Sequence, residues 1–308
     1  FLANAGVCSR READEFITLA GENTVYVQNG ENYKEAGYTA QDGCDGDITD
    51  QVTVSGDVDT STAGSYILTY EVKDSSGNEA SMQRTVRVYA PVQVNTVDPG
   101  NKVVYLTFDD GPGPYTAQLL DVLDKYNVKA TFFVTNTRPD YRTMIAEEAK
   151  RGHTVAIHSA SHTYSQIYQS EDAYFADLEE MNQIIIEQTG QGAQIIRFPG
   201  GSSNTVSAKY SRGIMSRLVK DVEARGFLYC DWNVSSGDAD SRPISTQQVV
   251  QNVTEGMQKN NVSIVLQHDI KEFSVNAVEQ IIQWGLAEGY TFLPLSTSSP
   301  MSHHGVNN

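Results

Sequence analysis

The stretch Val103-Val-Tyr-Leu-Thr-Phe-Asp-Asp-Gly-Pro-Gly-Pro114 decides how the larger part of this chain folds. Its apolar run, 103–108, is typical of a buried strand, and the glycines and prolines that follow cannot extend that strand. The run therefore predicts that Asp109 and Asp110 stand at the carboxyl end of a buried strand. Taken alone, the two carboxylates also fit an ordinary acidic turn, because Asp and Gly are common turn residues.

Six further apolar runs follow this strand and alternate with segments in which apolar residues recur at helical spacing. The runs cover 130–135, 153–157, 194–198, 227–233, 262–267 and 290–295. Seven strands with helical crossovers within residues 102–296 indicate a parallel α/β fold. It is either a barrel one unit short of eight or an open doubly wound sheet.

The segment 17–90 has a different pattern, in which short alternating runs are separated by Asn, Asp and Gly turns. Strands are expected at 24–27, 52–54, 66–72 and 85–89. This pattern predicts a small antiparallel β-sandwich in front of the α/β domain.

Three remaining segments connect or flank these two domains. Residues 1–16 form a charged leader of uncertain origin, and 91–101 reads as a short linker because Pro and Gly surround a polar centre. The tail, 297–308, is polar, and we expect its His303 and His304 to be solvated.

The composition of the 308 residues excludes several classes of partner. A formal charge of −17 disfavours nucleic acid, because neutralising phosphates requires clustered Lys and Arg. No run of 18 apolar residues occurs, so no membrane span is expected, and a signal peptide is either absent or already removed. Cys8, Cys44 and Cys230 lie far apart without a C-x-x-C pair, which excludes a thiolate zinc site by spacing.

Reactive side chains stand at the carboxyl ends of five of the predicted strands. They are Asp109, Asp110, His158, His162, Arg197, Asp238 and His268. In a parallel barrel the carboxyl ends of the strands share one rim, so these residues would converge although they are up to 159 positions apart. Two histidines four positions apart, with a carboxylate from another strand, fit a three-ligand metal site with room for water.

Five segments in this order and spacing resemble the polysaccharide deacetylase family, the NodB-homology domain of carbohydrate esterase family 4. They are Thr107-Phe-Asp-Asp-Gly111, His158-Ser-x-x-His162, Arg197-Phe-Pro199, Trp232 to Asp238, and Leu266-x-His268. The resemblance covers about 102–296 and implies a distorted barrel of seven or eight strands. Residues 17–90 resemble the bacterial immunoglobulin-like modules of surface and secreted proteins, through segments such as Asp45-Gly-Asp-Ile-Thr-Asp50.

The resemblance to the deacetylases implies a metal centre. Asp110, His158 and His162 would hold a divalent ion, commonly Zn²⁺ and otherwise Co²⁺, Ni²⁺ or Mn²⁺. Such an ion polarises the acetamide carbonyl and lowers the pKa of a bound water.

The resemblance also implies an acid, a base and their partners. Asp109 would be the general base, paired with Arg197, and His268 would be the general acid that protonates the departing amine. Asp238 would pair with His268 and keep it protonated. Asp231 is a rival for that role, but it lies within the predicted strand, whereas Asp238 follows Trp232 at the spacing of the family.

Three further residues would contact the substrate. The backbone N–H of Gly200 would stabilise the oxyanion, Leu266 would line the slot for the acetyl methyl, and Trp232 would supply an aromatic wall for the sugar. The chain departs from the family at two points, because many members carry Tyr where Gly200 stands and Trp where Ala239 stands. The aromatic walls are therefore missing or come from elsewhere in the chain.

Together these features imply an extracellular or cell-surface hydrolase that removes N-acetyl groups from a cell-wall glycan, foremost the N-acetylglucosamine of peptidoglycan. A chitooligosaccharide N-deacetylase and a xylan O-acetyl esterase are alternatives, since one metal site can hydrolyse either acyl bond. An alternative of another class is a catalytically silent wall-binding protein. In each case the β-sandwich would contact the wall or another protein.

Overall fold

A computed structural model describes residues 16–90, 96–240 and 244–307 of the chain. It divides into two compact units, 1–91 and 92–308, and each is described by itself. The expected leader lies outside the described residues except for its last position, and the expected linker is described only from residue 96. The described part of that linker is attached to the second unit, because the N–H of Val97 donates to the carbonyl of Ser298 at 2.9 Å.

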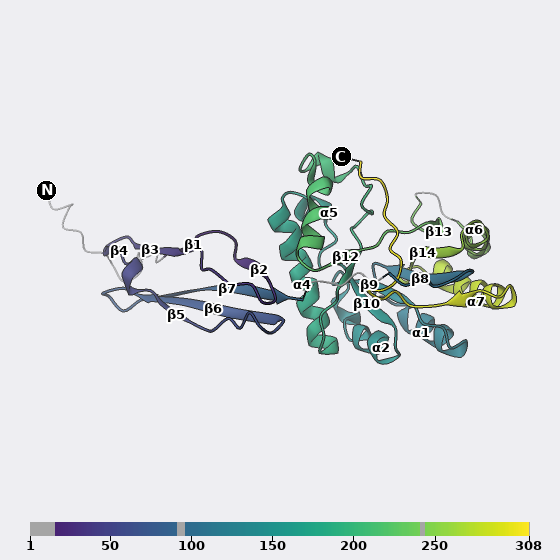
Figure 1. The fold of residues 1–308 in the computed structure, drawn as a ribbon, viewed down its shortest axis with the longest axis horizontal. Coiled ribbons are helices and arrows are strands. Elements are labelled where there is room, and N and C mark those ends of the chain that lie inside the picture. Colours follow the sequence, from purple (N-terminus) through teal and green to yellow (C-terminus); the bar gives the residue numbers. More distant parts are fainter. Residues whose placement is uncertain (1–15, 91–95, 241–243, 308) are drawn as a thin grey trace. The chain divides into compact units, whose positions relative to one another are not determined.

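Two small sheets form the first unit (Figure 1). One sheet contains β1 (Phe16–Leu19), β3 (Tyr38–Asp42) and β4 (Gly46–Asp47). The other runs in the order β2 (Thr24–Gln28), β7 (Glu79–Tyr89), β6 (Gly64–Lys73) and β5 (Thr53–Ser55). All four predicted strands are present. β2 and β7 pair in parallel, however, so the unit is not wholly antiparallel as expected.

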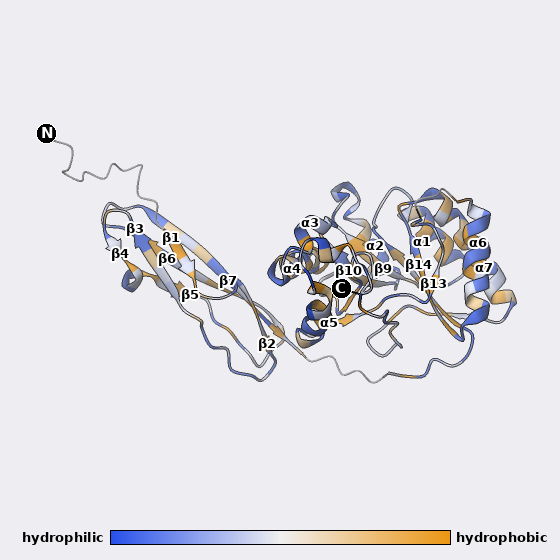
Figure 2. Cartoon of the chain, turned by 90° about the horizontal axis from the view of Figure 1, so that it is seen from above, coloured by the Kyte–Doolittle hydropathy of each residue, from blue (hydrophilic) through white to orange (hydrophobic). Residues whose placement is uncertain are grey.

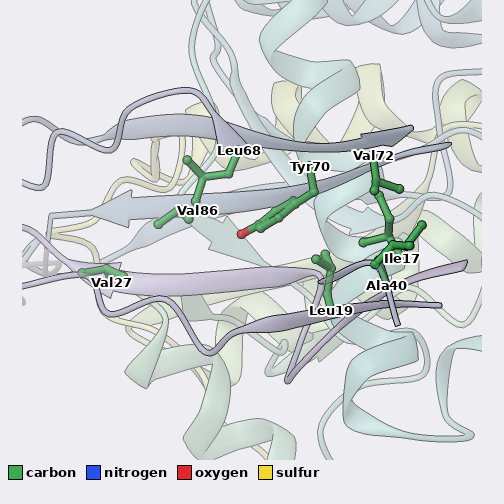
Figure 3. Packing of buried hydrophobic residues seen from close by; sticks show 9 residues of the cluster. Ile17, Leu19, Val27, Ala40, Leu68, Tyr70, Val72 and Val86 are labelled. Carbon is green, nitrogen blue, oxygen red and sulfur yellow. The ribbon is translucent and has the colours of Figure 1, made fainter. Parts of the chain in front are cut away.

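The core of this unit comes from the alternation of its strands. Residues two positions apart share one face of a strand, and the inward faces of both sheets are apolar. Figure 3 shows the resulting cluster, which contains Ile17, Leu19, Val27, Ala40, Leu68, Tyr70, Val72 and Val86. A polar group is buried beside it: the Arg84 guanidinium pairs with Glu35, whose carboxylate also accepts a 2.7 Å hydrogen bond from the Tyr70 hydroxyl.

The second unit is built on an eight-stranded parallel sheet with β8 (Val103–Asp109) near its middle. The strand order is β12-β11-β10-β9-β8-β14-β13, and β15 also pairs with β8. The other strands are β9 (Thr131–Thr135), β10 (Thr154–Ser159), β11 (Ile195–Ile196), β12 (Leu228–Tyr229), β13 (Val234–Ser235), β14 (Val262–His268) and β15 (Thr291–Phe292). Within the described residues no ladder joins β12 to β13, so the sheet curls into a half-barrel without closing.

The predicted strand 227–233 is much shorter in the structure, because only β12 (Leu228–Tyr229) forms within it and the next strand, β13, begins at Val234. Just after β12, Cys230 N still donates to Ile196 O of β11, whereas the next residue leaves the sheet and Asp231 N donates to Ser302 O at 2.7 Å. The C-terminal tail thus takes the place of a neighbouring strand at this point. Cys230 itself is free and buried, as its apolar surroundings predict.

Helices connect the strands and cover the outside of the sheet (Figure 1). They are α1 (Thr116–Lys125), α2 (Met144–Lys150), α3 (Tyr164–Ile167), α4 (Glu171–Thr189), α5 (Ile214–Ala224), α6 (Thr246–Lys259) and α7 (Glu272–Ala287). Figure 2 shows hydrophilic and hydrophobic residues on opposite sides of α6 and α7, as expected for helices with one face on a sheet. No helix in the described part of the chain is long and apolar enough to cross a membrane.

The ends of α4 follow from its sequence. The Ser170 hydroxyl accepts a hydrogen bond from the N–H of Ala173 and so caps the first turn. Gly190 ends the helix in the left-handed conformation, with φ of 79°, which glycine adopts without a Cβ clash. These two caps determine where α4 begins and ends, and the helix packs against β10.

Of the two tail histidines that were expected to be solvated, His303 is exposed and His304 is half-buried, and both contact the folded unit. The His303 ring stacks on Tyr229 with 3.9 Å between ring centroids, and His304 N donates to Asp231 Oδ2 at 2.8 Å. The short β12 leaves polar backbone and carboxylate groups uncovered, and the tail residues bond to them. His303 and His304 therefore belong to the folded second unit.

Candidate active site

The two carboxylates at the end of β8 have different surroundings. Asp109 is the last residue of the strand and is buried, whereas Asp110 has φ of 70°, a left-handed conformation that ends the strand. The Thr135 hydroxyl donates to the Asp110 carbonyl at 2.9 Å and holds this turn against β9. The abrupt turn is what points two adjacent side chains at two different sets of neighbours.

Asp110 meets two histidines, His158 near the end of β10 and His162 in the loop that follows it. Its Oδ1 lies 3.5 Å from His158 Nε2 and 3.3 Å from His162 Nε2, and one ligand atom from each residue lies within 4.8 Å of the others. Asp110 Oδ1 is also buried without a hydrogen-bond partner in the described structure. A buried carboxylate oxygen without a donor is costly, and two imidazole nitrogens beside it complete a donor set that suits a divalent metal.

The protonation states agree with metal binding. Burial lowers the pKa of His158 against the raising effect of Asp109 and Asp110, so the ring is neutral, as a metal ligand must be. His158 Nδ1 donates to the carbonyl of Arg197 at 2.7 Å, which leaves Nε2 as the acceptor nitrogen. Burial opposes ionisation of Asp110, but the nearby histidines hold its pKa below the usual value.

Asp177 on α4 holds the loop that carries His162. Its carboxylate accepts from the Ser159 hydroxyl at 2.6 Å and from the N–H groups of Ala160 and Ser161 at 2.9 and 2.8 Å. Ser159 Oγ in turn accepts from His162 N at 2.8 Å. Since His162 has φ of 51°, this anchoring fixes an otherwise unfavourable backbone conformation.

Arg197 holds Asp109 from the centre of the half-barrel. The guanidinium is fully buried, and Nη1 donates to Asp109 Oδ1 at 2.8 Å and to Thr107 Oγ1 at 2.6 Å. The remaining nitrogens donate to the backbone carbonyls of Cys230 and Asp231. Asp109 Oδ2 lies on the metal-ligand side, 3.9 Å from His158 Nε2. One oxygen of Asp109 is thus fixed by an ion pair while the other faces the centre of the site.

His268 reaches the same site from β14, which pairs directly with β8, so that His268 and Asp109 are neighbours in register. His268 Nδ1 lies 2.7 Å from Asp238 Oδ1, and its Nε2 lies 3.8 Å from Asp110 Oδ2. Burial alone would lower the pKa of His268, but the hydrogen bond and charge of Asp238 raise it above the usual value. The arrangement therefore favours a protonated imidazole whose Nε2–H faces the site.

Asp238 is itself held firmly. Its Oδ2 accepts from His268 N at 2.8 Å and from the Ser274 hydroxyl at 2.6 Å. Burial would raise the pKa of Asp238, but the hydrogen bond and charge of the His268 side chain, with the bond from Ser274, lower it. The rival, Asp231, bonds elsewhere: its carboxylate accepts from Ser202 N and Oγ at 2.9 and 2.5 Å.

The three residues expected to contact substrate stand at the carboxyl ends of their strands, near the site. Gly200 is exposed and has φ of 78° in the loop after β11. Leu266 is buried in β14, two positions before His268. Trp232 is half-buried, 5.7 Å from the Arg197 guanidinium, and its ring meets His304 edge-on at 4.7 Å. Their roles toward a substrate remain predictions.

Two residues near the metal ligands were missed by the sequence reasoning. Asp177 lies on a helix behind the loop, in a segment whose apolar stripe predicts only core packing. Tyr164 follows His162 by two positions, and its ring packs edge-on against that imidazole with 5.7 Å between centroids. Its position directly after the His-x-x-x-His pair was the available signal.

Comparison with known proteins gives one family for each unit. The family model for polysaccharide deacetylase matches residues 96–215, and the one for the Ig-like domain of bacterial surface proteins matches residues 17–88. A putative polysaccharide deacetylase, YheN, of Bacillus subtilis is 32% identical over 197 residues, which are 63% of this chain and 67% of the relative. A peptidoglycan-N-acetylglucosamine deacetylase of Bacillus cereus is 33% identical over 196 residues, covering 62% of this chain and 68% of the relative.

A solved structure is more similar still. The crystal structure of the catalytic domain of peptidoglycan N-acetylglucosamine deacetylase from Eubacterium rectale is 78% identical and has a TM-score of 0.69. The match covers 70% of this chain and 97% of that structure. The polysaccharide deacetylase Bc1974 from Bacillus cereus is 31% identical with a TM-score of 0.56, over 67% of this chain and 96% of that one.

Proposed function

The chain belongs to the polysaccharide deacetylase family, and from that premise we propose that it is a metal-dependent hydrolase that removes N-acetyl groups from the N-acetylglucosamine of peptidoglycan. One observation carries the proposal. The side chains of Asp110, His158 and His162 converge around a buried carboxylate oxygen that has no hydrogen-bond partner among the described residues. Asp109 Oδ2 lies 3.9 Å from His158 Nε2, and His268 Nε2 lies 3.8 Å from Asp110 Oδ2.

Asp110, His158 and His162 would hold the metal ion, for which Zn²⁺ is the first candidate and Co²⁺, Ni²⁺ or Mn²⁺ are others. Imidazole nitrogen with carboxylate oxygen is a common donor set for zinc, and three protein ligands leave a position for water. When bound, the ion polarises the acyl carbonyl and acidifies water at neutral pH.

The chain's own residues move the protons. Asp109, with one oxygen fixed by Arg197, accepts a proton from the attacking water through its other oxygen. His268, kept protonated by Asp238, donates a proton from Nε2 to the departing amine of the sugar. The N–H of Gly200 would face the oxyanion, and Leu266 and Trp232 would enclose the acetyl methyl and the sugar.

The first unit supports a location at the cell surface, where the substrate is found. Its family model describes Ig-like domains of bacterial surface proteins, and two relatives are named for action on peptidoglycan. We propose that this unit contacts the cell wall or a protein at the wall, and that the enzyme acts outside the cell.

Acetate release from purified polymers tests the proposed function. The protein is incubated with peptidoglycan, chitooligosaccharide and acetylated xylan in the presence of each candidate metal. Peptidoglycan is expected to release acetate fastest, and Asp109→Asn to lower that rate by about 10²–10⁴-fold without unfolding the chain. Faster release from either other polymer would reassign the substrate, and full activity of Asp109→Asn would contradict the mechanism.

A further inference from the structure

The Tyr164 hydroxyl occupies the space in which a side chain at position 200 would begin. A Cβ placed on Gly200 would lie 2.6 Å from Tyr164 Oη and 3.5 Å from Tyr164 Cζ. Tyr164 opens α3 and Gly200 lies in the loop after β11, so the contact joins two separate loops of the site. The phenol hydroxyl therefore lies next to Gly200, the residue whose backbone N–H is proposed to face the oxyanion.

Aromatic packing fixes the position of this hydroxyl. The Tyr164 ring meets His162 edge-on on one side and stacks on Tyr168 on the other, with centroids 5.5 Å apart and planes 24° apart. Tyr168 is fully buried, and its own hydroxyl donates to the carbonyl of Pro199 at 2.8 Å. The ring behind Tyr164 is thus tied to the loop that carries Gly200, and the Tyr164 side chain loses little further freedom when it binds a ligand.

The Tyr164 hydroxyl is free to donate a hydrogen bond to a ligand. No hydrogen bond to Tyr164 Oη occurs among the residues that the structure describes, although the side chain is half-buried. A phenol carries its proton at neutral pH, because its ordinary pKa is about 10. A fixed, protonated O–H beside the metal ligands can stabilise negative charge that develops on a substrate oxygen.

We propose that Tyr164 is a catalytic residue, a second oxyanion donor whose hydroxyl bonds the acyl oxygen of the substrate beside Gly200. The inference rests on the proposed hydrolase function and deepens it by assigning recognition of the acyl group to α3. No covalent step is involved: the O–H donates to the oxygen as the carbonyl carbon becomes tetrahedral, and the proton stays on Tyr164.

The variant Tyr164→Phe tests this assignment, because it removes one oxygen and keeps the ring that packs on His162 and Tyr168. Hydrolysis is measured on peptidoglycan and on 4-nitrophenyl acetate, which carries the acyl group without a sugar. We expect kcat to fall about 10- to 100-fold on both substrates with KM nearly unchanged, as for loss of an oxyanion donor. Bound metal and the thermal midpoint, measured on the same samples, should stay at the wild-type values.

Tyr126→Phe is the matched control. Tyr126 lies directly after α1, where its hydroxyl bonds Glu279 at 2.8 Å, so the same atom is removed away from the strand ends that carry the site. An unchanged kcat for Tyr164→Phe on 4-nitrophenyl acetate would overturn the proposal, and so would a loss matched by a fall in bound metal. If the wild-type protein cleaves 4-nitrophenyl acetate but no glycan, the proposed glycan substrate is contradicted. The effect of Tyr164→Phe on 4-nitrophenyl acetate still tests the role of Tyr164.

Discussion

The candidate active site has two halves, the proposed metal ligands and the proposed acid with its partner, and they shift the pKa of histidine in opposite directions. In the metal-ligand half, His158 Nδ1 donates to a backbone carbonyl, and burial lowers the pKa of the ring. In the acid half, His268 Nδ1 bonds the carboxylate of Asp238, which raises the pKa despite burial. The partner of Nδ1 therefore distinguishes the proposed ligand from the proposed acid, because the carboxylate of Asp238 offsets the effect of burial on His268 and the backbone carbonyl does not offset it on His158.

The largest effect is expected in the metal-ligand half. Asp110→Ala removes the carboxylate between the two imidazoles, so metal binding should be lost and acetate release should fall on the order of 10⁴-fold. Metal content by elemental analysis and acetate release are measured together. Asp140→Ala, at an exposed position in the loop after β9, is the control and should retain both. Bound metal at wild-type stoichiometry in Asp110→Ala would contradict the ligand assignment.

Removing His268, the proposed acid, should slow the reaction without affecting metal binding. His268→Ala is expected to keep its metal but to slow N-deacetylation by about 10³-fold, because an amine leaves poorly without a proton. Hydrolysis of 4-nitrophenyl acetate should fall much less, since its leaving group is stable as an anion. Equal losses on both substrates would show that His268 acts on something other than the leaving group.

The charge of Asp238 can be removed while its shape is kept. In Asp238→Asn the pKa of His268 should fall, because the carboxylate that raises it is gone. The protonated acid is then lost at lower pH, so the alkaline limb of the pH–rate profile should move to lower pH, with about 10²-fold less activity near neutrality. A profile unchanged in shape would rule out Asp238 as the group that keeps His268 charged.

The smallest effect is expected for Asp177, which holds the loop that carries the proposed metal ligand His162. Asp177→Asn weakens the bonds that hold the loop 159–162, so metal affinity should fall about 10- to 100-fold while kcat at saturating metal stays near the wild-type value. Metal titration followed by activity measures both quantities. Asp172→Asn, exposed on the same helix, serves as control. Unchanged affinity in Asp177→Asn would show that the loop holds its shape without this anchor.

Much of the fold was predictable because the strands of the second unit are buried on both faces. β8 and β14 read as continuous apolar runs, and the structure has them at nearly the expected bounds. The run 227–233 could not be read in the same way. There the N–H of Asp231 donates to the carbonyl of Ser302, which is more than seventy positions away. No local sequence pattern predicts that the C-terminal tail takes the place of a strand.

The sequence likewise predicts some of the site residues and not others. A carboxylate or histidine directly after an apolar run could be assigned to the carboxyl end of the sheet, since all strands are parallel. Asp177 and Tyr164 could not be assigned, because neither follows an apolar run at a strand end: Asp177 lies within α4 and Tyr164 opens α3. The contacts of His303 with Tyr229 and of His304 with Asp231 were missed for the same reason.

The sequence by itself determined which residues stand at the strand ends, because alternation and apolar runs are local properties of the chain. Only the tertiary structure decided what each of them meets. Asp109 and Asp110 are adjacent and chemically identical, but the left-handed turn at Asp110 sends one to Arg197 and the other to two histidines. Charge state and reactivity depend on such through-space neighbours, which are fixed when the sheet curls and brings distant strands together.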